Sequence, residues 1–338
     1  RSVFIISLTG PIIFYFCLKQ KFKRCDNLLL ILVSSILFLS PYFRTSSYWG
    51  LEENFAIISL LLTFLFFDKF LSNYDERKNK YLLFLTIFFS SLCLYFDPKF
   101  IIIPLICFFQ IIFSSKSSKL KNFSVFLYFI FSLPYIYLIL FWGNIIPSQD
   151  AGLRGIGDKV YLAHLGYAST IISFYLFPLL FFKKKGLFIL FRNFFKTKKN
   201  IYFLSLFFIY LLYLLIFYDY DSESKLGKGI VHKTAILFFE ENYLQKIYTF
   251  FSFFISWLIL LVYLNNNLKD KLIIIYFFLL SIIGWPILQE YFDPLIMLMA
   301  FTFFGSKLFI NYKNSIFLFM YLSILLIFSN IYYYNLLN

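Results

Sequence analysis

The residues best suited to chemistry lie in one stretch between two apolar runs, from Ser40 to Asn54. The stretch contains a cation, two adjacent carboxylates and two aromatic side chains with polar tips: Arg44, Glu52, Glu53, Tyr48 and Trp49. An ionised side chain beside hydrocarbon costs several kcal/mol, so such residues are rarely retained without a role. One interpretation is an ordinary loop, in which Pro41 ends a helix and an aromatic belt follows. We favour the other, the lining of a polar substrate cavity at the membrane surface.

Two further polar stretches carry carboxylates between apolar runs. Residues 143–159 are rich in glycine and end in Asp158 and Lys159. They match neither a GxGxxG fingerprint nor a P-loop, so we do not expect nucleotide binding. The short turn 289–294 carries Glu290 and Tyr291, and its alternative interpretation is a helix cap with an aromatic belt.

The longest polar stretch, 219–246, contains Gly227-Lys228-Gly229 and is a candidate lid along the membrane surface. Each of the two histidines, His164 and His232, stands alone, and a lone histidine is more often structural than a metal ligand. The four cysteines show no CxxC spacing. We therefore predict neither a metal centre nor a disulfide framework, and a divalent metal is not indicated although the sequence leaves it open.

Composition defines the class of protein that must position these residues. Of 338 residues, 61% are hydrophobic and 14% are charged, against roughly 25% charged in soluble domains. This predicts an all-α, polytopic transmembrane helical bundle with about 11–12 spans, forming a single domain over residues 1–338. The apolar runs at 28–41, 55–67 and 100–113 are short for a span of roughly 20 residues. Arg1 leads directly into an apolar run, so we expect the chain to be the C-terminal, larger part of a longer protein.

Charge is distributed unevenly between alternate loops. Six loops carry 22 lysines and arginines, whereas the intervening loops carry eight. Twelve of the 17 acidic residues belong to the second set. The positive-inside rule accounts for the net charge of +14 without a nucleic acid partner and places the basic loops in the cytoplasm. The polar chemistry then faces the periplasm or a lumen, in a bacterial inner membrane or the endoplasmic reticulum.

The order of these features resembles that of the multi-spanning glycosyltransferases of the GT-C class, which use polyprenyl-phosphate-linked sugars. The run that begins at Arg1 resembles the helix that follows their first outer loop. Residues 144–178, with Gly157-Asp158-Lys159, His164 and Pro178, are similar to the central part of the dolichyl-phosphate-glucose α-1,2-glucosyltransferase family, and residues 289–292 resemble its Glu-Phe-Arg-Tyr-Phe pattern. Two features depart from the family: the arginine of that pattern is missing, and Asp97-Pro98-Lys99 replaces an arginine-containing turn.

The resemblance implies transfer of a sugar from a polyprenyl-phosphate donor to a lipid-linked, glycan or protein acceptor, with membrane lipid as surroundings and no other cofactor. A cation would hold the leaving phosphate, with Arg44, Lys99, Arg154 and Lys159 as candidates. The class places its catalytic carboxylate in a loop that would precede Arg1, so the base stays unknown, with Glu52, Glu53 and Asp158 as candidates. The full set of predicted substrate-binding residues is Arg44, Tyr48, Trp49, Glu52, Lys99, Asp158, Lys159, His164, Glu290 and Tyr291.

Three alternatives remain. A transporter or flippase for lipid-linked saccharides would need charged residues within its helices and often internal repeats. The sequence shows no internal repeat, and the centres of its apolar runs are almost free of charge, which counts against this alternative. An oligosaccharide polymerase or ligase would also place basic and acidic residues on outer loops, so the sequence separates it poorly. A purely structural membrane subunit is the third.

The uneven number of lysines and arginines in alternate loops predicts which loops face the cytoplasm. Loops 183–199 and 68–80 should face the cytoplasm, and loops 42–54 and 219–246 the opposite side. A cysteine introduced by Lys225→Cys should react with an impermeant reagent in intact cells, whereas one introduced by Leu190→Cys should not. The reverse labelling pattern would overturn the topology.

Overall fold

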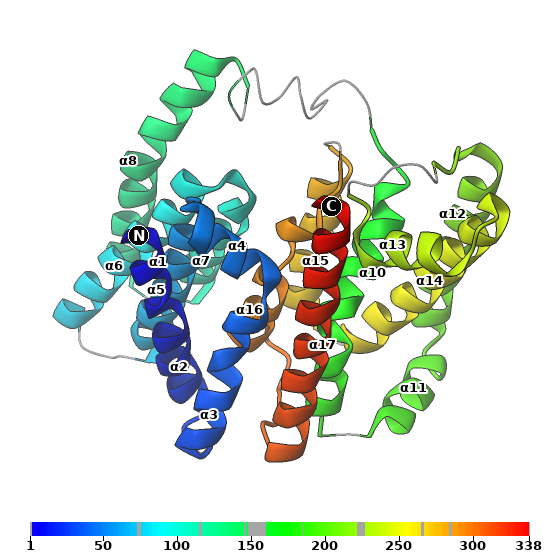
Figure 1. Ribbon diagram of the computed structural model, residues 1–338. Helices are drawn as coiled ribbons and strands as arrows, with labels where there is room; N and C mark the ends of the chain where they lie inside the picture. Colours follow the sequence, from blue (N-terminus) through cyan, green and yellow to red (C-terminus); the bar gives the residue numbers. More distant parts are fainter. Residues whose placement is uncertain are drawn as a thin grey trace. The chain divides into compact units, whose positions relative to one another are not determined.

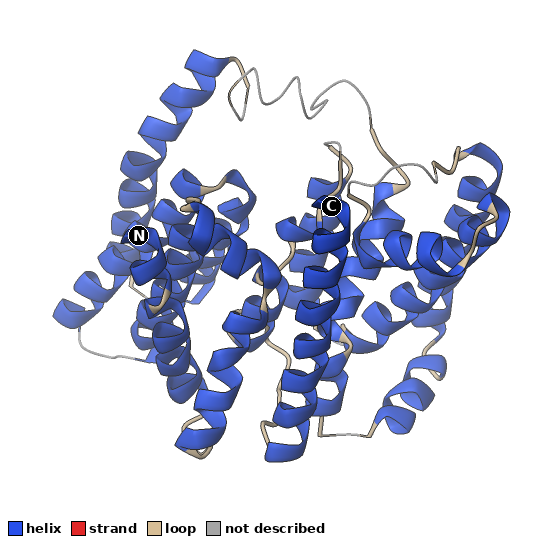
Figure 2. Cartoon of the chain, in the orientation of Figure 1, coloured by secondary structure: helices blue, strands red, loops and turns tan. Residues whose placement is uncertain are grey.

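The protein is all-helical in a computed structural model that describes residues 2–72, 76–114, 117–144, 147, 160–184, 186–221, 227–264, 267–283 and 286–337 (Figures 1 and 2). Within these residues every regular element is an α-helix or a 3-10 helix. In hydrocarbon a backbone N–H or C=O has no water to bond, so a chain this apolar satisfies its peptide groups within helices. The predicted fold class, an all-α polytopic bundle, is confirmed.

The described residues contain fewer spans than the sequence predicts. Eight helices are long and apolar enough to cross a membrane, or nine if the bent pair Asn27–Leu39 and Pro41–Trp49 counts as one span, against about 11–12 expected. The run at 55–67 lies within a full 20-residue helix, α5 (Glu53–Ser72). In contrast, the run at 294–306 contains only the seven-residue α16 (Leu295–Phe301), in which every residue is buried. An apolar run therefore marks either a span or a short helix surrounded by protein.

The chain divides into two compact units. Unit 1 consists of residues 1–151 and 319–338, and unit 2 of residues 152–318. The boundary falls within helix α17 (Tyr312–Leu337): residues 312–318 belong to unit 2, and the rest of the helix belongs to unit 1. The other elements of unit 1 are α1 (Ser2–Ser7), α2 (Thr9–Lys21), α3 (Asn27–Ser34), η1 (Ser35–Leu39), α4 (Pro41–Trp49), α5, α6 (Glu76–Phe96), η2 (Pro98–Ile101), α7 (Ile102–Ser114) and α8 (Ser118–Trp142).

Helices α2 and α5 form a parallel pair in unit 1. Near their first turns the Asn54 amide donates to Ser7 Oγ (2.9 Å), and near their last turns the Gln20 amide donates to Asp68 (2.6 Å). Asn54, from the acid-bearing stretch 42–54, thus lies at one end of the pair, and Gln20 and Asp68, from the lysine-rich loops, lie at the other. Which end faces the cytoplasm remains a prediction.

Unit 2 is built around the buried helix α10 (His164–Leu176), which packs against α13, α14, α15 and α16. The remaining elements are η3 (Pro178–Phe182), α11 (Leu187–Phe195), α12 (Lys198–Phe217), α13 (Gly229–Phe238), α14 (Asn242–Tyr263), α15 (Leu268–Ser281), η4 (Gln289–Tyr291) and α16. The stretch 219–246, predicted as a loop, therefore includes the helix α13 and the first turn of α14. Gly166 on α10 lies against the ring of Phe253 on α14, and a methyl group at this position would overlap that ring.

This close approach yields a stability prediction. Gly166→Ala should destabilise unit 2 by about 1–3 kcal/mol, because the added Cβ overpacks the α10–α14 contact. Gly186→Ala is the matched control, since a Cβ added at that position would have nothing within 4 Å. Thermal unfolding of the detergent-solubilised chain should show a lower midpoint for the first variant only. Equal midpoints would show that Phe253 can move aside without loss of packing energy.

Candidate functional site

The stretch 40–54 folds into a short helix and a tight turn. Ser40 Oγ accepts a hydrogen bond from the Phe43 backbone N–H (3.0 Å) and Pro41 occupies the first helical position, which together start α4. Gly50 ends α4 with a φ of +71°, a conformation that glycine adopts without steric cost. The chain then enters α5 at Glu53. The sequence thus turns a polar stretch into a helix that is fixed at both ends.

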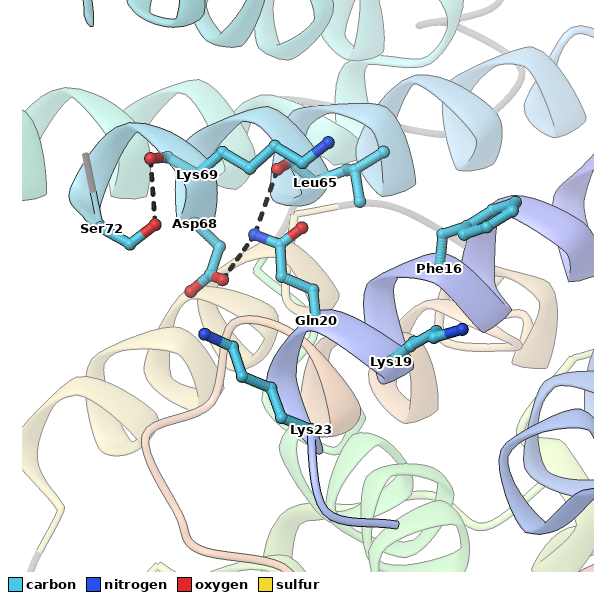
Figure 3. A pocket seen from close by; sticks show the side chains of 8 residues that line it. All are labelled: Phe16, Lys19, Gln20, Lys23, Leu65, Asp68, Lys69 and Ser72. Atoms are coloured by element: carbon cyan, nitrogen blue, oxygen red, sulfur yellow. Dashed lines mark hydrogen bonds between the residues drawn. The ribbon is translucent and has the colours of Figure 1, made fainter. Parts of the chain in front are cut away.

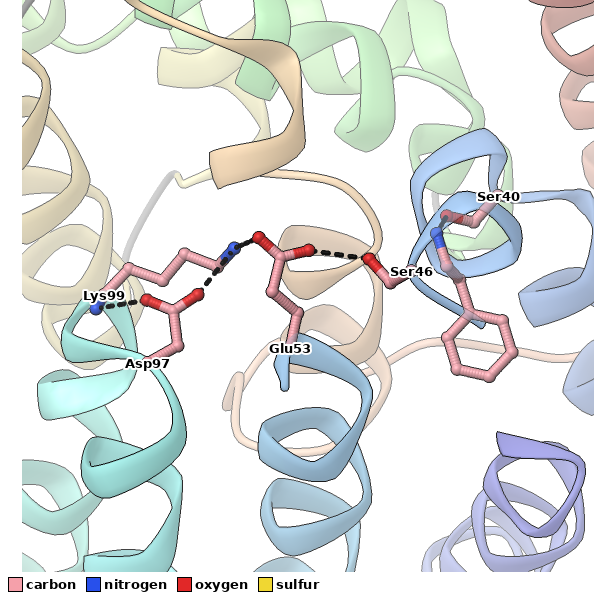
Figure 4. A network of polar contacts seen from close by, with 6 residues as sticks. Ser40, Ser46, Glu53, Asp97 and Lys99 are labelled. Carbon is pink, nitrogen blue, oxygen red and sulfur yellow. Dashed lines mark hydrogen bonds and ion pairs between the residues drawn. The ribbon is translucent and has the colours of Figure 1, made fainter. Parts of the chain in front are cut away.

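A charged network fastens α4 to α5 and η2 (Figure 4). Ser46 Oγ on α4 donates to Glu53 Oε2 (2.7 Å), and Lys99 Nζ lies 3.2 Å from Glu53 Oε1. Lys99 Nζ also lies 2.9 Å from Asp97 Oδ2, and Asp97 Oδ1 accepts from the Lys99 backbone N–H (3.0 Å). The Lys99 ammonium therefore joins its own turn, through Asp97, to the start of α5, 46 residues earlier in the chain, and Glu53 passes the connection on to Ser46 of α4.

The network is largely removed from solvent. The side chains of Lys99, Glu53 and Asp97 are 10%, 24% and 17% exposed. Burial by itself lowers the pKa of the Lys99 ammonium, but Asp97 and Glu53 together outweigh burial, so its pKa is raised above the ordinary value of 10.5. Lys99 is thus held as a cation that two carboxylates already neutralise.

A buried amide completes the attachment of α4. Asn54 is 1% exposed, and its Nδ2 lies 2.8 Å from Ser47 Oγ and 3.1 Å from the Phe43 carbonyl oxygen on α4. Its contact with Ser7 extends the connection to α1. Ser46 and Ser47 therefore hold α4 through adjacent residues of α5, Glu53 and Asn54.

A cavity of about 260 Å³ lies beside this attachment. It is lined by one cation, two serines, a tyrosine and apolar side chains: Phe4, Ser7, Leu8, Phe38, Phe43, Arg44, Ser47 and Tyr48. The Tyr48 ring stacks on Phe4 with centroids 5.8 Å apart. Among these lining residues Arg44 supplies the positive charge, so the cavity joins a guanidinium and hydroxyls to an apolar wall. Such a cavity suits an anion attached to a hydrocarbon chain.

The other predicted residues are distributed as follows. Glu52 and Trp49 are exposed, Trp49 by 79%. Asp158, Lys159 and Arg154 lie outside the described residues. His164, Glu290 and Tyr291 belong to unit 2. The structure therefore brings together two pairs in unit 1, Arg44 with Tyr48 at the cavity and Glu53 with Lys99 in the network.

His164 has a structural environment. It is 1% exposed, its Nδ1 lies 2.9 Å from the Ser281 carbonyl oxygen, and its ring stacks on Tyr161 with centroids 5.0 Å apart. These contacts join the start of α10 to the end of α15. The sequence analysis did not predict the roles of Ser46 and Ser47, near the end of α4, or of Asn54, at the start of α5, because single hydroxyl and amide side chains carry no distinctive motif.

Unit 2 contains a buried polar cluster around α13. Tyr220 Oη lies 3.2 Å from His232 Nδ1, and Lys228 Nζ lies 2.8 Å from the carbonyl oxygen and 3.5 Å from Oδ2 of Asp221. Lys228 is 1% exposed and has a φ of +58°, between two glycines that also have positive φ. Burial lowers its pKa, and Asp221 offsets this only in part. The cluster fixes the entry to α13 within the predicted lid segment.

The described part of the chain holds no group of three or more His, Cys, Asp or Glu side chains suited to a metal ion. Comparison with protein-family models, with curated proteins and with solved structures finds no match for this chain. The site is therefore interpreted from its own geometry.

The ion cluster predicts a large effect of removing its centre. Lys99→Met should destabilise the protein by on the order of 3 kcal/mol, because Glu53 and Asp97 would be left close together without a cation. Lys80→Met, at an exposed lysine on α6, is the matched control. Since the pKa of Lys99 is raised, its contribution is complete below its ordinary pKa of 10.5 and is lost as the pH rises through the raised value.

Thermal unfolding midpoints of both variants and of the unchanged protein, measured from about pH 7 to 11.5, check this prediction. The difference in unfolding midpoint between the unchanged protein and Lys99→Met should stay constant near neutral pH and become smaller at the alkaline end of the range. A difference no larger than that of Lys80→Met would show that the cluster does not stabilise the fold.

Proposed function

We propose that the protein is a membrane glycosyltransferase that takes a sugar from a polyprenyl-phosphate donor. The observation that carries this proposal is the cavity of unit 1, which Arg44 lines together with hydroxyl-bearing and apolar residues. A polyprenyl phosphate combines an anion with a long hydrocarbon chain. Arginine matches the phosphate oxygens with paired N–H donors, and the phenylalanine walls match the first isoprenoid units.

The geometry suggests a division of roles within the site. Phosphate leaving from a lipid carrier separates charge, so a nearby cation stabilises the transition state more than the bound donor. We assign that role to Arg44, because Lys99 is already neutralised by two carboxylates. Glu53, held by Ser46 and Lys99, positions α4 and through it Arg44. Glu52 and Asp158 remain candidates for the group that accepts the proton of the acceptor hydroxyl.

Replacing the cavity arginine tests the proposal. Arg44→Ala should lower turnover about 100-fold or more in membranes supplied with a panel of polyprenyl-phosphate sugars, because one donor to the developing charge is lost. Lys159→Ala should also lower turnover if that residue joins the same phosphate site. Arg24→Ala, at an exposed arginine between α2 and α3, is the matched control and should retain full turnover.

The readout is transfer of labelled sugar from the lipid donor, with insertion of each variant verified by its amount in the membrane. Unchanged turnover in Arg44→Ala would remove Arg44 from the site. Transfer from a soluble nucleotide-sugar in the absence of a lipid donor would overturn the mechanism as a whole.

A further inference from the structure

We propose that a second cavity, at the lysine-rich end of unit 1, binds the headgroup of an anionic phospholipid. The cavity has a volume of about 380 Å³ and lies between the last turns of α2 and α5 (Figure 3). Its lining combines three lysines, one carboxylate and two apolar side chains with a glutamine and a serine: Lys19, Lys23, Lys69, Asp68, Phe16, Leu65, Gln20 and Ser72. It lies at the opposite end of the α2–α5 pair from Arg44, so this proposal is independent of the proposed function.

The lining is ordered by depth along both helices. Phe16 precedes Lys19 and Gln20 by one helical turn on α2, and Leu65 precedes Asp68 and Lys69 by one turn on α5. A turn advances about 5.4 Å along the axis. Both helices are candidate membrane spans, and both end at this cavity. On each helix an apolar residue therefore precedes a lysine in the direction of the helix end. In Figure 3 the Lys23 ammonium points toward Asp68, whereas the Lys69 side chain extends back beside Leu65.

Charge selects the kind of headgroup. Three lysines and one carboxylate line the cavity, so the cavity is net positive and favours an anion over a zwitterion. The C-terminal ends of two helices carry negative partial charge, so the lysine side chains alone must hold that anion. Basic pockets between transmembrane helices at a membrane surface are suited to anionic lipid headgroups.

Asp68 adds selectivity among anionic lipids. One of its oxygens, Oδ2, accepts a hydrogen bond from Gln20 Nε2 (2.6 Å), and Gln20 also reaches the Leu65 carbonyl oxygen (3.4 Å). A carboxylate can accept about four hydrogen bonds, so acceptor capacity remains for a ligand donor. A phosphodiester whose headgroup carries hydroxyls, such as phosphatidylglycerol, would place its phosphate at the lysines and a hydroxyl at Asp68.

Binding of defined lipids to the purified full chain in detergent, followed by native mass spectrometry, tests this inference. The triple substitution Lys19→Gln, Lys23→Gln and Lys69→Gln should weaken phosphatidylglycerol binding on the order of 100-fold, at roughly fivefold for each lysine near the surface. The matched control is Lys196→Gln, Lys198→Gln and Lys199→Gln, which removes three exposed lysines of unit 2 and should change binding less than about twofold.

Two further comparisons in the same binding measurement identify the ligand. Phosphatidylmethanol, a phosphodiester of the same charge that has no headgroup hydroxyl, should bind more weakly than phosphatidylglycerol, and Asp68→Asn should reduce that difference. Equal weakening in both triple variants, or equal binding of zwitterionic phosphatidylcholine, would overturn the site. Displacement of the lipid by inorganic phosphate would identify a soluble phosphate site and overturn the lipid assignment.

Discussion

The satisfaction of backbone hydrogen bonds in an apolar environment is the constraint on which the whole structure depends. With 61% hydrophobic residues, the chain can place long segments in hydrocarbon only if each peptide group finds its partner within the same segment. Helices meet this requirement, and side chains such as those of Ser90, Thr63 and Thr86 return their hydroxyls to carbonyl oxygens of the same helix. The interior therefore contributes packing, whereas polar recognition is left to the helix ends.

At those ends, charge is stabilised by partners from other segments. Lys99 is buried because Asp97 lies in its own turn and Glu53 begins another helix. Asp270 in unit 2 shows the same principle with a backbone donor, since the Gly305 N–H lies 2.8 Å from its Oδ1. Burial raises the pKa of Asp270 above its ordinary value, and that N–H and Lys183 offset the rise only in part. Each such contact joins a helix end to another segment and so restricts how neighbouring helices can move.

The two cavities of unit 1 occupy opposite ends of the α2–α5 pair and differ in their electrostatics. One holds a single arginine beside serines and aromatic rings, and the other holds three lysines around a carboxylate. A phosphate ester fits the chemistry of both. The first cavity is fastened by the buried hydrogen bond between Asn54 and Ser47, and in the second Gln20 donates to Asp68 in a part-buried contact. The first is therefore the more preorganised of the two, as the proposed catalytic role would require.

By itself, the sequence determined the class of the protein, because hydrophobic content and the alternation of basic loops report directly on the membrane environment. It also singled out Arg44, Tyr48, Glu53 and Lys99 as candidate site residues, since charges and polar aromatic side chains beside apolar runs are rare. It predicted about 11–12 spans, whereas the described residues contain eight helices long and apolar enough to cross a membrane, or nine with the bent pair. An apolar run reads alike whether lipid or protein covers it, as α16 illustrates. Only the tertiary structure paired Lys99 with Glu53, which lies 46 residues earlier, and so distinguished a neutralised lysine from the arginine that lines the cavity. That distinction depends on through-space distance, which no local pattern of residues records.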